Sequence, residues 1–80
     1  MDFSIYLGQF KHRVFASTAR IGTLCKLNHS ACNKLGHGTI YLVIDKIRES
    51  HYEVLKLKPV YGRNQQIKTI SGCRYIYIKR

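Results

Sequence analysis

The stretch GTIYLVIDKIRESHYEVLKLK, residues 38–58, is the part of this sequence that most strongly determines the fold. Its first half is apolar at every position from Ile40 to Ile44, so an extended chain there has apolar side chains on both of its faces. Such two-sided apolarity is typical of a strand in the interior of a sheet. The sequence therefore predicts a central strand over residues 38–45.

The second half of this stretch, HYEVLKLK (residues 51–58), alternates apolar and polar side chains like a half-buried strand. Leu55 and Leu57 point to one face of this strand, and two lysines point to the other. The five residues KIRES between the two runs predict the loop of an antiparallel hairpin. We expect Leu55 and, on the first strand, Leu42 to lie in the core.

Further strand patterns lie on both sides of this hairpin. QIKTI (residues 66–70) and CRYIYIK (residues 73–79) are separated by a Ser-Gly turn and predict a second hairpin. FSIYL (residues 3–7) and HRVFAS (residues 12–17) predict two strands on either side of a turn at Gly-Gln.

The segment from Ile21 to Leu35 fits two patterns. Its first residues alternate as in a strand, but the whole segment also has apolar residues and cysteines at i, i+3, i+4 and i+7 spacing, as on one side of a helix. Good helix formers outnumber β-branched residues, and Gly36 stands where a helix often ends. The sequence favours a helix from about Thr23 to Leu35.

Together these elements predict an α+β fold that is mostly β. We expect a small barrel-like or curled antiparallel sheet of about five or six strands with one short helix, similar in size to SH3-like and OB-like barrels. The 80 residues are enough for a single domain over 1–80 and leave no room for a second. A chain this short buries only about 60–65% of its unfolded surface, so the core is small.

The segment CKLNHSACNKLGH (residues 25–37) contains two cysteines and two histidines, which raises the question of a zinc site. On a helix the Cα atoms of Cys25 and Cys32 are about 10.5 Å apart. Two thiolates on one zinc lie within about 4 Å of each other, so a helix excludes a site that uses both. We expect no metal and no other cofactor. The alternative is a zinc site in an unwound segment, with the ligands Cys25, His29, Cys32 and His37.

Charge is the least ordinary feature of the composition. The chain has 14 Lys and Arg against 4 Asp and Glu, and no acid follows Glu53. Such an excess destabilises a small fold by self-repulsion unless a polyanion relieves it. Nucleic acid is therefore the expected partner, and RNA is preferred to DNA because tyrosines among cations suit unpaired bases. The residues expected to contact phosphates or bases are Lys56, Lys58, Arg63, Lys68, Arg74, Tyr75, Tyr77, Lys79 and Arg80.

The last predicted strand leaves one question open. Tyr75 and Tyr77 lie on one face, and Ile76 and Ile78 lie on the other. The nucleic-acid interpretation needs the tyrosine face to be exposed. It also expects further binding residues on a neighbouring strand: Lys56, Lys58 and Tyr52. The alternative buries the tyrosines and exposes the isoleucines, and periodicity does not distinguish between the two.

The predicted function is a small basic nucleic-acid-binding module, structural or regulatory and without catalytic activity, such as a ribosome-associated component. One alternative is a protein-binding inhibitor or adaptor of virus or plasmid type that acts on an acidic partner surface, because Tyr and Arg are common at interface hot spots. A second alternative is a small metal-independent ribonuclease, with His12 or His51 acting beside Arg74 and Tyr75.

The sequence also bears on where the protein works. Three cysteines, an odd number, argue against a closed disulfide framework and fit the cytoplasm or another reducing compartment. The start MDFSIYLGQFKHR lacks the apolar core of a signal peptide. The uncharged stretch LGHGTIYLVI (residues 35–44) is much shorter than the roughly 20 residues of a membrane-spanning helix. We expect an intracellular protein with no membrane partner.

Overall fold

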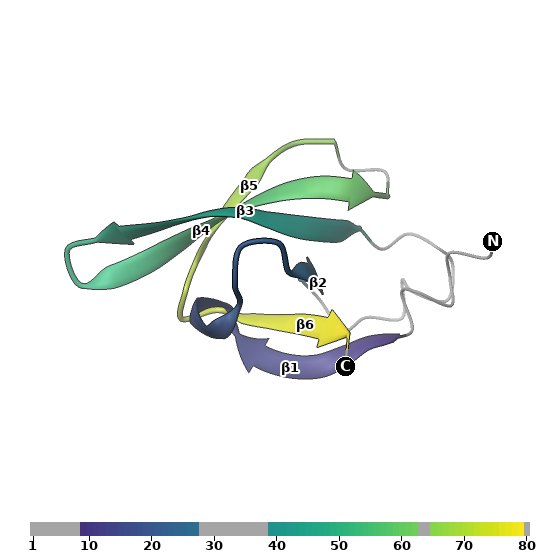
Figure 1. The fold of residues 1–80 in the computed structure, drawn as a ribbon, viewed down its shortest axis with the longest axis horizontal. Coiled ribbons are helices and arrows are strands. Elements are labelled where there is room, and N and C mark those ends of the chain that lie inside the picture. The colour runs from purple at the N-terminus through teal and green to yellow at the C-terminus, as the bar shows by residue number, and fades with distance from the viewer. Residues whose placement is uncertain (1–8, 28–38, 63–64, 80) are drawn as a thin grey trace.

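The fold is a curled antiparallel sheet with its main core on the inner face (Figure 1). In this computed structural model the described residues are 9–27, 39–62 and 65–79. They form six strands in the order β1-β6-β2-β3-β4-β5. The elements are β1 (Phe10–Phe15), the 3-10 turn η1 (Ala16–Thr18), β2 (Leu24–Lys26), β3 (Ile40–Glu49), β4 (Tyr52–Tyr61), β5 (Lys68–Ser71) and β6 (Tyr75–Lys79).

The mostly β, antiparallel class is therefore confirmed, but the barrel is not closed. In the part of the chain that the structure describes, β1 and β5 are the two edges of the sheet and do not pair with each other. Helical structure among the described elements is limited to η1. No helix in this part of the chain is long and apolar enough to cross a bilayer.

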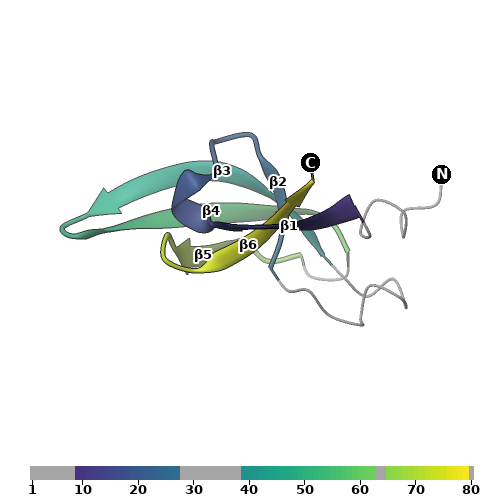
Figure 2. The ribbon, with the colours of Figure 1, turned by 90° about the horizontal axis from the view of Figure 1, so that it is seen from below.

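The predicted hairpin over residues 38–58 is confirmed as β3 and β4, which pair from Ile40 and Tyr61 to Glu49 and Tyr52. Its loop is shorter than expected, because most of KIRES continues β3 and only two residues form the turn. Ser50 adopts a φ of 42° there, as tight hairpin turns require. The hairpin tip projects beyond the other strands (Figures 1 and 2).

The predicted hairpin of residues 66–70 and 73–79 is wrong, although both segments contain strands. β5 pairs with β4, whereas β6 pairs with β1 and β2. The turn between them bonds to other elements. The Gly72 N–H donates to the Glu53 carbonyl oxygen at 2.7 Å, and the Gly72 carbonyl accepts from the Ser17 N–H at 3.0 Å. The curled sheet has two layers, one of β3, β4 and β5 and one of β1, β6 and β2 (Figure 1). The chain passes from the first layer to the second at this turn.

Gly72 permits this crossing because the backbone is crowded there. A Cβ atom at Gly72 would lie 3.1 Å from the Ser17 Cβ and 3.2 Å from the Glu53 carbonyl oxygen. Neither atom is the far end of a flexible side chain, so a larger residue would displace η1 or β4. The glycine thus allows η1, the hairpin and the start of β6 to meet.

The predicted helix from Thr23 is wrong at its start, because Leu24–Lys26 form the strand β2. This strand lies between β3 and β6. The residue before β2 is also bonded to β3, because the Val43 N–H donates to the Thr23 carbonyl oxygen at 2.9 Å. Sheet bonds from both neighbours satisfy this backbone, and helix propensity is too weak to compete with them. The rest of the predicted helix, and the predicted strand at 3–7, lie outside the described residues.

The main core consists of inward-facing side chains from β2 to β6 and from the region of η1: Ala16, Ala19, Cys25, Tyr41, Val43, Leu55, Leu57, Ile70 and Ile76. Leu55 is therefore a core residue as predicted. Leu42 is only half-buried and lies on the outer face, where its register partner is the exposed Leu24. The predicted core face of β3 was thus the wrong one, because both of its faces are apolar.

A smaller cluster covers part of the outer face. Phe10 of β1 and Ile40 of β3 are both buried there. Tyr61 of β4 and Tyr77 of β6 pack against them. This cluster explains why β3 needs apolar side chains on both faces.

Candidate nucleic-acid interface

The outer face of β1 and β6 carries a cluster of two aromatic rings and a guanidinium group: Arg13, Phe15 and Tyr75. Antiparallel pairing places Tyr75 directly opposite Phe15. The two rings are stacked, with centroids 4.6 Å apart and an interplanar angle of 19°. The Cζ atom of Arg13 lies 4.5 Å from the centre of the Tyr75 ring, within cation–π range. We call this group the Arg13–Phe15–Tyr75 cluster.

This cluster faces solvent because of the alternation in both strands. In β1, Val14 packs against the main core, so Arg13 and Phe15 point outward. In β6, Ile76 is fully buried in that core. Phe15 and Tyr75 remain 47% and 44% exposed. The alternative that buries Tyr75 is therefore wrong.

Tyr77 shares the outer face with Tyr75 but has a different environment. It is half-buried and packs against Phe10 and Ile40. Its register partner on β2 is Lys26, a lysine that is almost completely buried. Burial lowers the pKa of the Lys26 ammonium group below its usual value. Tyr77 therefore contributes to packing, which leaves Tyr75 as the more accessible ring.

The structure divides the sequence-predicted binding residues into two groups. The first group, on β4 and β5, is exposed: Lys56, Lys58 and Lys68. The second group lies on β6 or just before it: Arg74, Tyr75, Tyr77 and Lys79. The expectation that the lysines of β4 lie on a strand next to β6 is wrong, because β2 and β3 separate the two strands in the sheet. Arg63 and Arg80 lie outside the described residues.

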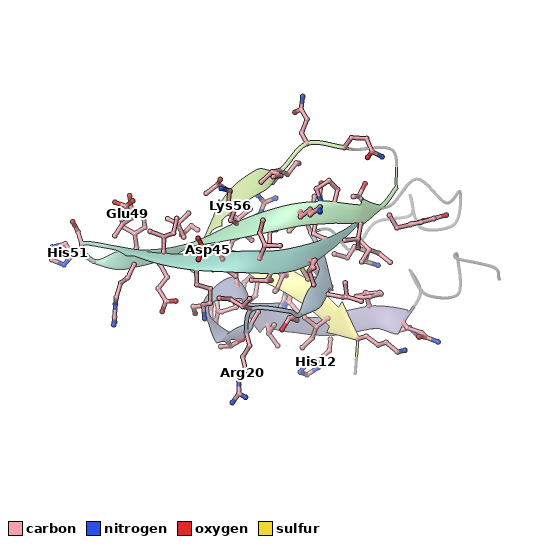
Figure 3. All side chains as sticks on the ribbon, turned by 45° about the horizontal axis from the view of Figure 1, so that its top comes forward. His12, Arg20, Asp45, Glu49, His51 and Lys56 are labelled. Carbon is pink, nitrogen blue, oxygen red and sulfur yellow. The ribbon has the colours of Figure 1, made fainter. Side chains whose placement is uncertain are left out.

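The charges are unevenly distributed between these two groups. All acids among the described residues lie on the β3–β4 hairpin: Asp45, Glu49 and Glu53. Asp45 is the register partner of Lys56, and Figure 3 shows the two on the same part of the sheet. By contrast, the Lys and Arg side chains of β1 and β6 have no acid on either strand. Among the described residues, the cations of β1 and β6 thus lie on strands without acids, whereas those of β4 belong to the hairpin that carries the acids.

Arg13 and Phe15 were not among the residues that sequence reasoning selected. The alternation in FKHRVF places both on one face of a strand, so this much was readable from the sequence. Their place beside Tyr75 depends on the pairing of β1 with β6, two strands that are far apart along the chain. No local pattern contains that information.

Cys25, the first residue of the cysteine–histidine segment, is a core residue in β2 and is fully buried. Burial raises the pKa of its thiol to about 12. Metal binding requires the thiolate, which this environment disfavours. Among the described residues, no group of three or more His, Cys, Asp or Glu side chains could hold a metal ion. The other residues of the alternative zinc site, His29, Cys32 and His37, lie outside the described residues.

The raised pKa of Cys25 predicts selective thiol chemistry. At pH 8, iodoacetamide should label the exposed Cys73 of the native protein and leave Cys25 unmodified, because burial both shields the thiol and keeps it protonated. In denaturant, Cys25 should react as readily as Cys73. Peptide mass spectrometry measures each site separately, with Cys73 as the internal control. Labelling of native Cys25 at the rate of Cys73 would contradict its place in the core.

The histidines proposed for the ribonuclease alternative lie in different parts of the fold (Figure 3). His12 is on β1, where its register partner is Ile78 of β6. His51 is in the turn at the tip of the β3–β4 hairpin. The structure therefore does not bring the two imidazoles together.

His51 does contribute to a cavity of about 320 Å³ between the hairpin tip and the turn that precedes β6. Its walls include Phe15, Arg48, His51, Tyr52, Glu53 and Gly72. Phe15 thus belongs both to this cavity and to the Arg13–Phe15–Tyr75 cluster. Sequence reasoning missed the cavity because its walls come from three separate segments of the chain.

Comparison with known proteins gives no further assignment. No family model matches the chain, and no curated protein or solved structure matches it significantly. The candidate interface therefore rests on the residues and geometry of this chain alone.

Proposed function

We propose that this protein is a small nucleic-acid-binding module that holds single-stranded RNA on the outer face of β1 and β6. The Arg13–Phe15–Tyr75 cluster is the observation that carries the proposal. It combines two exposed, stacked rings and a guanidinium group on strands that carry no acid. Aromatic rings that lie among cations on a sheet are the usual means of binding unpaired bases.

The chemistry of the cluster fits a single strand better than a duplex. Every base has a π-face, so exposed rings bind bases of any sequence by stacking, provided the bases are not already stacked in a helix. The described part of this surface consists of strands and presents no helix to the major groove of DNA. The cations of the same strands neutralise the phosphates that follow each stacked base.

Individual residues have different roles in this proposal. Phe15 and Tyr75 provide the stacking surface, and Arg13 holds the Tyr75 ring in place and contacts phosphate. Lys79, at the end of β6, contacts a further phosphate. Lys56 and the other lysines of β4 and β5 lie in the other layer of the sheet, so they add long-range attraction.

A titration of fluorescently labelled oligouridine by anisotropy tests the proposal. Tyr75→Ala should weaken binding by about 1–3 kcal/mol, because one stacking surface is lost. The control is Ile47→Ala, which removes a side chain of nearly equal exposure, 43%, from the β3–β4 hairpin. The control should bind like the unmodified protein. A folded Tyr75→Ala variant with full affinity would refute the stacking role.

The same titration separates the proposal from its two alternatives. A ribonuclease would shorten the RNA, which a denaturing gel of the titration mixture detects. An inhibitor of an acidic protein would bind oligouridine weakly even at low salt. Either result would replace the RNA-binding module as the function of this chain.

A further inference from the structure

We infer that the cavity at the tip of the β3–β4 hairpin binds one unpaired guanine base of the RNA. This inference rests on the proposed function and names the base that the protein selects. It is carried by the paired Glu53 and Arg48 in the cavity wall, together with the ring of Phe15 that the cavity shares with the stacking cluster.

The cavity has the size and the lining of a site for a flat aromatic ligand. Its volume of about 320 Å³ is at the lower end of the range for small-molecule pockets. Phe15 and Tyr52 supply aromatic walls. Gly72 adds a wall without a side chain, and its backbone hydrogen bonds to Ser17 and Glu53 hold this wall in place. A single base fits these dimensions, whereas a duplex does not.

The position of Phe15 connects the cavity to the stacking surface. Its ring stacks on Tyr75 and also lines the cavity. A strand that is stacked on Phe15 and Tyr75 therefore reaches the cavity within a short length of its backbone. Arg48 and His51, at the hairpin tip, place donors at the same cavity for the phosphate or the base.

Glu53 is held so that its carboxylate can accept hydrogen bonds in the cavity. Its side chain is 33% exposed, and its Oε2 atom lies 3.5 Å from Nζ of Lys46. Lys46 is itself anchored, because its Nζ donates to the Ser17 carbonyl oxygen at 2.8 Å. The ion pair restrains the carboxylate and leaves acceptor sites on its two oxygens.

Arg48 lines the same cavity as this carboxylate. It is the register partner of Glu53 across the hairpin, so both side chains leave the same face of the sheet. The wall therefore presents an acceptor-only group next to a donor-only group. A ligand that satisfies both must carry donors next to an acceptor.

Guanine alone among the four RNA bases has two adjacent donors, N1–H and N2–H₂, followed by the acceptor O6. The two donors match the two oxygens of the Glu53 carboxylate, and O6 matches the Arg48 guanidinium group. Adenine and cytosine each offer one donor group, and uracil offers a single N–H between two carbonyls. These three bases leave one carboxylate oxygen without a hydrogen bond.

Four single-stranded RNAs test the inference: oligouridine, and the same chain with one central guanosine, adenosine or cytidine. The unmodified protein should bind the guanosine RNA about tenfold more tightly than the other three, as for one bidentate base contact. A fifth RNA with inosine, which lacks N2–H₂, should lose most of this preference. Equal binding of all five RNAs would overturn the guanine site while leaving the proposed function intact. A failure to bind any of them would overturn the proposed function itself.

Substitutions then assign the preference to Glu53 and Arg48. Glu53→Gln should reduce the guanosine preference to about twofold or less, because the amide replaces one acceptor by a donor. Glu49→Gln is the matched control: it makes the same charge change on the same hairpin, at a residue whose register partner is Tyr52. The control should retain the full preference.

A second substitution keeps the inference testable if the loss of the Lys46–Glu53 ion pair unfolds the chain. Arg48→Lys preserves the charge but removes the planar fork, and should lower the preference by about threefold or more. Circular dichroism of each variant establishes that it is folded. A folded Glu53→Gln or Arg48→Lys protein with the full guanosine preference would overturn the assignment of these residues.

Discussion

Leu55→Ala is expected to lower the free energy of unfolding by about 2–5 kcal/mol. Leu55 has 0% exposure and belongs to the main core, where β4 lies between β3 and β5. Its truncation removes buried apolar surface and leaves a cavity that the paired strands cannot close. Typical domains have only about 5–15 kcal/mol of stability, and a domain of this size lies near the lower end. Urea unfolding followed by circular dichroism measures the change.

Leu42→Ala is the control for this substitution. It removes the same side chain from the neighbouring strand, but from the outer face, where Leu42 is only half-buried. The expected loss is about 1–2.5 kcal/mol, roughly half of the value for the fully buried Leu55. A larger loss at Leu42 than at Leu55 would mean that the sheet curls with its other face inward.

Binding of oligouridine is expected to weaken about 50-fold when the salt concentration rises from about 50 mM to about 200 mM. In the proposed complex, about four phosphates are neutralised by the cations on and beside β1 and β6: Lys11, Arg13, Arg74 and Lys79. Each phosphate contributes about −0.7 to the slope of log K against log salt on a single strand, so the slope should be about −2.8. Anisotropy titrations at four salt concentrations measure it.

Two double variants identify the surface that is responsible. Replacing Lys11 and Lys79 by Gln should flatten the slope by about 1.4. Replacing Lys56 and Lys58 by Gln removes the same charge from β4, in the other layer, and should change the slope much less. If the second variant flattens the slope as much as the first, RNA binds across β4 and β5, and the site on β1 and β6 is wrong.

The sequence predicted which types of residue the candidate site contains, but not how most of them are arranged. The absence of acids after Glu53 and the alternation of Tyr75 with Ile76 were readable, and the exposure of Tyr75 agrees with the nucleic-acid interpretation. The residues that contact the Tyr75 ring, Arg13 and Phe15, are far from it in sequence. Their contribution depends on strand pairing, which alternation does not specify.

The sequence by itself determined that the segments of β1, β3, β4, β5 and β6 are extended, and for β4 it also determined which face is apolar. This information is local, because successive side chains of a strand point to opposite faces whatever the strand pairs with. The β3–β4 hairpin was predictable for the same reason, since a short turn between two strand patterns makes them neighbours.

The tertiary structure alone decided the partners of β2, β5 and β6 and the inner face of β3. β5 and β6 are close in sequence, yet they pair with different strands because the backbone of Gly72 bonds to Glu53 and Ser17. β3 is apolar on both faces, so burial of one face depends on which strands cover it. Contacts between distant segments are set by the free energy of the whole packed sheet, and no local period in the sequence encodes them.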